Sequence, residues 1–226
     1  MSRIFEALDS ARGFLEGLDI PGEAAALQPA AAHAGVSVTG LFSSVSMEEE
    51  MVRLHQHLNA LLPDHAHRAI QFIGSCEGEG TSTVVHEFAR VSAARFGQRV
   101  LLLEMDRRAA AASTSGDKTF DVAPLPPEFL AASHTTDSRE PAAAWERLRT
   151  ANDLVLVDSP PATTSPEGLA VCSQVDGVVL VLAAEDTRWP VAERVKQSIE
   201  RSGGRVLGIV LNKRQYHIPQ FIYRRL

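Results

Sequence analysis

The residues best suited to chemistry lie in a glycine-rich segment between an apolar run and a helical stretch. Strand, glycine-rich loop and helix together bind phosphate well, because backbone N–H groups converge on the anion and the helix dipole adds to them. The Ser82 hydroxyl stands where such loops hold Mg²⁺. We predict that nine consecutive residues contact a nucleotide: Ser75, Cys76, Glu77, Gly78, Glu79, Gly80, Thr81, Ser82 and Thr83.

This segment departs from the usual phosphate-loop pattern, Gly-x4-Gly-Lys-Ser/Thr. Ser75 stands at the first glycine and Thr81 at the lysine. Taken alone, the segment fits a glycine-rich turn without a ligand about equally well.

Acidic residues end two later apolar runs. Glu104 and Asp106 close one run, and Asp158 closes another. In an open α/β sheet, ligands gather at the carboxyl ends of the strands, and Mg²⁺ prefers oxygen ligands. We predict that Ser82 and Asp158 hold Mg²⁺, and that Glu104, Asp106 and Asp158 are the catalytic acids if the protein is active.

The elements that must position these residues alternate between strands and helices. The predicted strands are continuously apolar, which indicates a mostly parallel sheet with helices on both faces, an α/β fold. Residues 107–140 are expected to form loops with one strand near Phe120. The predicted strands are 69–73, 99–104, 153–158, 177–183 and 205–211, and the predicted helices are 47–62, 80–96 and 190–201.

The chain has 226 residues, enough for one α/β domain and a short appendage. We predict an amphipathic helix over residues 1–20, a flexible linker over 21–46 and the α/β domain over 47–226. The net charge of −6 argues against nucleic-acid binding. The sequence shows no export signal and no apolar run long enough to span a bilayer, so we expect a cytoplasmic protein.

The order of these motifs resembles the bacterial tyrosine kinases of capsule and exopolysaccharide synthesis. The resemblance rests on the loop, the segment 101–108, Asp158-Ser-Pro-Pro161 and Gly208-Ile-Val-Leu-Asn212. These kinases belong to the deviant Walker-A ATPases, with the septum-site and plasmid-partition ATPases. The resemblance implies a P-loop NTPase fold, Mg-ATP or Mg-ADP as cofactor, and a membrane polysaccharide chain-length or export protein as partner.

The resemblance also assigns roles to single residues. Asn212 matches the position that contacts adenine, and Glu50 and Arg53 match an element of ring assembly that implies a homo-oligomer. The chain departs from the family pattern at Thr81, at Glu104 in place of aspartate, and at Gln56 in place of arginine. A C-terminal tyrosine cluster is missing, since the sequence has only two tyrosines, Tyr216 and Tyr223.

Three hypotheses follow. The leading one is a regulatory or scaffolding protein of exopolysaccharide production that binds nucleotide weakly or not at all, placed at the inner face of the membrane by its partner. The second is an active ATP-dependent tyrosine autokinase with an unusual loop and Tyr216 or Tyr223 as acceptor. For either hypothesis, Arg107, Arg108 or a basic residue of a partner could compensate in principle for the missing lysine. The third is a partition- or positioning-type ATPase.

Overall fold

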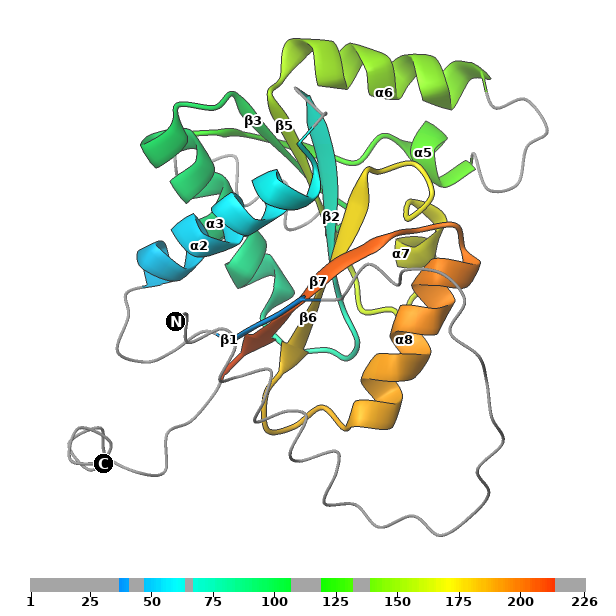
Figure 1. Cartoon of the computed structure of the whole chain (residues 1–226). Coiled ribbons are helices and arrows are strands. Elements are labelled where there is room, and N and C mark those ends of the chain that lie inside the picture. Colours follow the sequence, from blue (N-terminus) through cyan, green and yellow to red (C-terminus); the bar gives the residue numbers. More distant parts are fainter. Residues whose placement is uncertain (1–36, 41–46, 64–66, 107–118, 132–138, 214–226) are drawn as a thin grey trace, which may run out of the picture.

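The computed structural model describes residues 37–40, 47–63, 67–106, 119–131 and 139–213. Within them, seven strands form one sheet in the order β1-β7-β6-β2-β5-β3-β4 (Figure 1). All neighbouring strands run parallel. The strands are β1 (Ser37–Gly40), β2 (Arg68–Gly74), β3 (Val100–Glu104), β4 (Asp121–Pro124), β5 (Leu154–Ser159), β6 (Gly177–Ala183) and β7 (Val206–Asn212).

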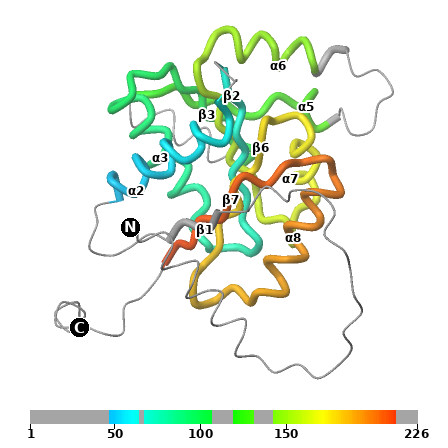
Figure 2. The backbone as a smooth tube through the Cα atoms, in the orientation of Figure 1, coloured from blue at the N-terminus to red at the C-terminus, as the bar shows by residue number. Residues whose placement is uncertain are grey.

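Helices cover both faces of the sheet, as the tube in Figure 2 makes clear. Helices α2 (Met47–Leu61) and α3 (Thr81–Phe96) pack on one face. The other face is covered by α5 (Pro127–Ala131), α6 (Arg139–Ala151), α7 (Glu167–Ala170) and α8 (Trp189–Arg201). The sheet is therefore the middle layer of three.

Alternation along each strand explains why the strands are apolar throughout. In β5, Leu154 and Leu156 pack toward α2 and α3, whereas Val155 and Val157 pack toward α5 and α6. Successive side chains of a strand point to opposite faces, so a strand covered on both sides needs apolar residues at every position. The predicted α/β fold with a parallel sheet and helices on both faces is confirmed.

Two regions differ from the prediction. Residues 37–40, assigned to a flexible linker, form the edge strand β1, which pairs with β7. This four-residue strand is held by a partner far along the chain, so local pattern gave no sign of it. The expected strand near Phe120 is β4, but the same stretch also contains α5, and α6 follows it. The amphipathic helix over 1–20, Arg107, Arg108 and both tyrosines lie outside the described residues.

Candidate functional site

The phosphate-loop segment lies at the carboxyl end of the central strand. Strand β2 ends at Gly74 and helix α3 begins at Thr81. Gly80 caps the helix in the left-handed conformation, with φ of 86°, and offers no side-chain hydrogen bond. The N–H groups of the first helical turn therefore lack both an intrahelical acceptor and a capping side chain, which leaves them available to an anion.

Two of the predicted acids meet beside this loop. Glu104 ends β3 and is paired in register with Asp158 on the adjacent strand β5. Both side chains are buried, with residue exposures of 1% and 8%. Ser82, in the first turn of α3, forms a hydrogen bond with Asp158. The structure thus brings together Ser82, Asp158 and Glu104 as the sequence predicted, with Asp106 close enough to act electrostatically on Asp158.

The carboxyl of Asp158 lies in a buried, acidic environment. Burial raises the pKa of its carboxyl to about 6, and the nearby charges of Glu104 and Asp106 act in the same direction. The hydrogen bond from Ser82 and the proximity of His86 oppose this rise. Among the described residues, the buried Oδ1 of Asp158 has no hydrogen-bond partner. A hard cation at this oxygen would compensate the buried charge.

His86 belongs to the same cluster, although the sequence analysis missed it. Its Nε2 lies 2.7 Å from Oε1 of Glu104. His86 follows Ser82 by four positions on α3, and residues four apart share a helix face. That spacing was a signal that could have found it. The contact positions the Glu104 carboxylate beside Asp158.

Glu79 has a role inside the loop that its sequence position did not reveal. Its carboxylate accepts hydrogen bonds from the backbone N–H groups of Ser75 at 2.5 Å and Cys76 at 2.9 Å, and from the Ser75 hydroxyl at 2.6 Å. The hydroxyl of Thr187, just after β6, donates to the same carboxylate. Glu79 is only 3% exposed. We therefore assign it as an internal brace that fixes the first half of the loop.

Two further contacts hold the loop from neighbouring strands. Asn212, the last residue of β7, donates from Nδ2 to the backbone oxygen of Glu79 at 2.9 Å. Thr163, after β5, donates from its hydroxyl to the backbone oxygen of Ser75 at 2.5 Å. The structure thus places Asn212 at the loop, where the sequence predicted a nucleotide contact, and shows that its amide group also clamps the loop.

The two loop glycines offer a matched test of this clamp. A Cβ on Gly80 would lie 2.3 Å from Nδ2 of Asn212, whereas a Cβ on Gly78 would meet nothing within 4 Å. Both glycines have positive φ, so alanine at either costs about 1 kcal/mol in backbone strain. We expect Gly80→Ala to cost about 2 kcal/mol more than Gly78→Ala, measured by urea unfolding, because it also breaks the clamp. Equal losses would contradict the clamp.

Thr81 stands at the position where a phosphate loop normally has lysine. A Cβ built on Gly74 would lie 2.8 Å from Oγ1 of Thr81, so this hydroxyl lies close against the start of the loop. The short side chain brings no charge to the crevice.

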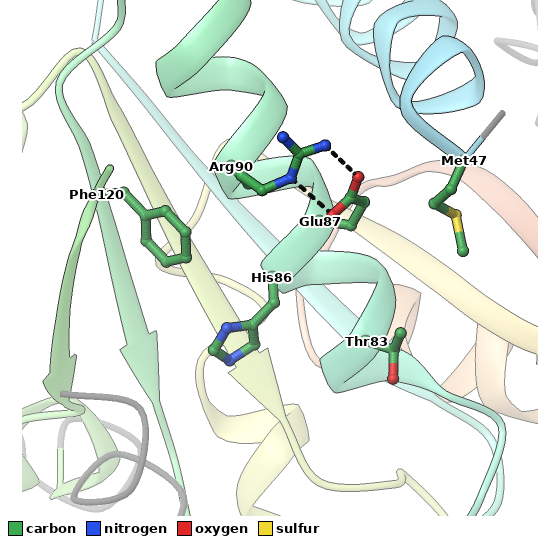
Figure 3. A pocket seen from close by; sticks show the side chains of 6 residues that line it. All are labelled: Met47, Thr83, His86, Glu87, Arg90 and Phe120. Carbon is green, nitrogen blue, oxygen red and sulfur yellow. Dashed lines mark hydrogen bonds and ion pairs between the residues drawn. The ribbon is translucent and has the colours of Figure 1, made fainter. Parts of the chain in front are cut away.

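A pocket of the described structure, the larger of two considered, lies beside the acids rather than over them. It has a volume of about 420 Å³ and lies against one side of α3 (Figure 3). Asp158 does not line it. The residues that do are Met47, Thr83, His86, Glu87, Arg90 and Phe120. A second pocket, of about 220 Å³, lies between the loop residues 76–79 and the start of α8.

No group of three or more metal-ligating side chains occurs among the described residues. A loop-bound Mg²⁺ takes one or two protein oxygens and completes its shell with phosphates and waters. Ser82 and Asp158 are the residues that fit this role. Glu50 and Arg53, predicted for oligomerisation, lie on α2, where Nη1 of Arg53 is 3.2 Å from Oε1 of Glu50.

Comparison with solved structures shows the fold. The chain aligns with the chimerical protein CapA2B2 at a TM-score of 0.61 and 20% identity, covering 79% of this chain and 93% of that one. The kinase domain of the Escherichia coli tyrosine kinase ETK aligns at 0.59 and 20% identity, covering 76% and 78%. The chain therefore shares the α/β fold of these two structures.

Comparison of sequences finds similarity to proteins named as tyrosine-protein kinases. Tyrosine-protein kinase YwqD of Bacillus subtilis is 23% identical over 209 residues, 78% of this chain and 85% of YwqD. Tyrosine-protein kinase CpsD of Streptococcus agalactiae is 34% identical over 68 residues, so the match spans 30% of either chain. This chain is thus similar in sequence to bacterial tyrosine-protein kinases. No family model matches it.

Besides His86, three residues at the loop were not predicted from the sequence: Thr163, Thr187 and Lys213. Lys213 follows Asn212 directly, and its side chain lies near Gly80. The position of Lys213 directly after Asn212, a predicted nucleotide contact, could have indicated it. No local feature of the sequence indicated Thr163 or Thr187. Among the described residues, no helix is long and apolar enough to cross a membrane.

Proposed function

We propose that this tyrosine-kinase relative is a regulatory or scaffolding protein of exopolysaccharide or capsule production. Its crevice binds Mg-nucleotide weakly and transfers phosphate slowly or not at all. The observation that carries the proposal is Thr81, a neutral side chain at the start of α3, beside a Ser82–Asp158 pair that is still in place. Binding of the ground state relies on backbone donors and Mg²⁺, whereas the transition state needs the missing charge.

The partners we propose follow from the resemblance to the capsule kinases. On this basis, the protein acts at the inner face of the membrane through a polysaccharide chain-length or export protein. Glu50 and Arg53 on α2 are the proposed element of homo-oligomer assembly. Glu50 is 2% exposed, so Arg53, whose side chain is 52% exposed, is the residue of this pair available to a second copy.

The test is calorimetric titration with Mg-ADP and Mg-ATP, followed by a phosphotyrosine assay, on wild type and Thr81→Lys. We expect the variant to bind about tenfold more tightly and to turn over about a hundredfold or more faster, because it regains a charge aimed at the transferring phosphoryl group. Ala94→Lys is the matched control: it adds the same charge at an exposed position near the far end of α3.

Three outcomes discriminate the hypotheses. A wild-type protein that phosphorylates tyrosine as fast as Thr81→Lys would be an active autokinase, and the regulatory proposal would be wrong. If neither protein binds nucleotide, the crevice is not a nucleotide site. Equal gains for Thr81→Lys and Ala94→Lys would show a general effect of charge rather than a role for position 81.

A further inference from the structure

Lys213 has an unusual backbone conformation at the edge of the nucleotide crevice. Its φ is 58°, and among the described residues it is the only one other than glycine with positive φ. Lysine is disfavoured in this left-handed region because Cβ approaches the backbone oxygen. Such a conformation persists where surrounding contacts hold it, and these positions cluster at functional sites.

The contacts that hold it are those of the preceding residue. Asn212 donates from Nδ2 to the backbone oxygen of Glu79, which ties the end of β7 to the loop. Its backbone oxygen accepts from the N–H of Ala184 at 2.8 Å, which ties the same point to the end of β6. With both sides of Asn212 fixed, the turn that follows is fixed as well.

This turn brings the Lys213 side chain to the phosphate loop. Its Cε lies 4.0 Å from the position that a Cβ on Gly80 would occupy. The ammonium group is one bond beyond Cε, so it is within reach of the loop at Gly80. Lys213 is exposed, and among the described residues no ion pair engages it.

The rest of the chain makes this position distinctive. The sequence has only three lysines, Lys118, Lys196 and Lys213. Lys196 lies on α8, where its Nζ is 3.7 Å from Glu200. Lys118 lies outside the described residues. Lys213 is thus the lysine that the described structure places at the loop whose own lysine is replaced by Thr81.

We infer that Lys213 supplies the positive charge that Thr81 lacks, and contacts the phosphate groups of the bound nucleotide from β7 instead of from α3. The inference rests on the proposed nucleotide site. A cation in this place stabilises bound phosphate by charge-assisted hydrogen bonding. Lys213 approaches the phosphates from β7 rather than from α3, so its charge is not aimed at the phosphoryl group as that group moves in the transition state. This is consistent with binding of the nucleotide without efficient phosphoryl transfer.

The experiment compares wild type and Lys213→Met in titrations with Mg-ADP, inorganic tripolyphosphate and adenosine. We expect Lys213→Met to weaken the first two by about tenfold or more and to leave adenosine unchanged, since adenosine has no phosphate. Lys213→Arg should retain most of the affinity. Lys196→Met is the matched control for the loss of one lysine, and Arg188→Met tests the exposed cation at the start of α8 that lines the second pocket.

Two further variants separate charge from folding. Lys213→Gly should keep or raise the melting temperature, since glycine tolerates positive φ, while it weakens Mg-ADP as much as Lys213→Met does. In a Thr81→Lys background, Lys213→Met should have a much smaller effect, because the two lysines serve the same phosphates.

Several results would overturn the inference. The inference about Lys213 fails, while the proposed nucleotide site stands, if wild type and Lys213→Met bind Mg-ADP equally well. The same holds if Arg188→Met, rather than Lys213→Met, weakens the binding of Mg-ADP. A parallel loss for adenosine would assign Lys213 to the base or ribose. Binding by Thr81→Lys but not by wild type would show that Lys213 does not replace the missing charge. If no variant binds nucleotide, the proposed function fails and this inference fails with it.

Discussion

Replacing Asp158 with asparagine is expected to stabilise the protein at pH 7.5 by about 3 kcal/mol in the absence of metal. Burial raises the pKa of this carboxyl from 3.8 to about 6, with Glu104 and Asp106 adding to the effect. Above pH 6 the folded protein must hold a buried charge that the unfolded chain exposes to water. Asparagine has the same shape, carries no charge and still accepts the Ser82 hydrogen bond.

The sign of the pH dependence follows from the raised pKa. The contribution of protonated Asp158 to stability is fully present below pH 3.8 and is lost as the pH rises to about 6. Wild type and Asp158→Asn should therefore unfold with similar free energies near pH 4 and differ most above pH 7. Urea unfolding at a series of pH values measures this difference, and other titrating groups cancel in the comparison.

Mg²⁺ links this prediction to the site. If Asp158 is a metal ligand, Mg²⁺ should stabilise wild type at pH 7.5 and leave Asp158→Asn unchanged. Asp121→Asn, at an exposed position on β4, is the control and should change stability by less than about 0.5 kcal/mol. A variant at Asp158 that is no more stable than wild type at any pH would show that the buried charge is already compensated.

Removal of the Glu79 carboxylate is expected to be among the most damaging changes in the loop. Glu79→Ala leaves two backbone N–H groups and the hydroxyls of Ser75 and Thr187 without their acceptor. Unsatisfied buried donors cost about 1–3 kcal/mol each, with partial relief from water, so we expect a loss of about 3–5 kcal/mol. Affinity for Mg-ADP should fall as well, because the loop is no longer held.

The loop contains its own control for this prediction. Glu77 is exposed, and its replacement by alanine should change the free energy of unfolding by less than about 0.5 kcal/mol. Glu79→Gln should be intermediate, since one acceptor oxygen remains while the amide N–H₂ faces donors. Similar unfolding free energies for Glu79→Ala and Glu77→Ala would show that Glu79 is not the brace of the loop.

Much of the site could be predicted because its main signals are local. Apolar runs in the sequence predicted five of the strands, namely β2, β3, β5, β6 and β7. The acids Glu104 and Asp158 stand at the ends of the runs that form β3 and β5. Parallel strands present their carboxyl ends at one edge, so Glu104 and Asp158 had to lie near the loop. The register pair of these two residues confirms this argument.

Helix α6 was missed because its stability is not local. Trp145 stacks on Phe129 with ring centroids 4.5 Å apart, and its Nε1 donates to Gln174 at 2.9 Å. Arg149 adds an ion pair with Asp176 at 2.7 Å. These partners belong to other elements, and a helix of 13 residues gains most of its stability from such packing.

The sequence by itself determined the parallel α/β fold, the loop and the acids around it, since strand and helix periods and the direction of the chain fix them. Only the tertiary structure distinguished buried Glu79 from exposed Glu77, two identical residues in one loop. The partners of Glu79 are 108 positions away at Thr187 and 133 away at Asn212. Contacts across such separations depend on how strands are ordered in the sheet, and that same order brings Lys213 to the loop that has Thr81 in place of lysine.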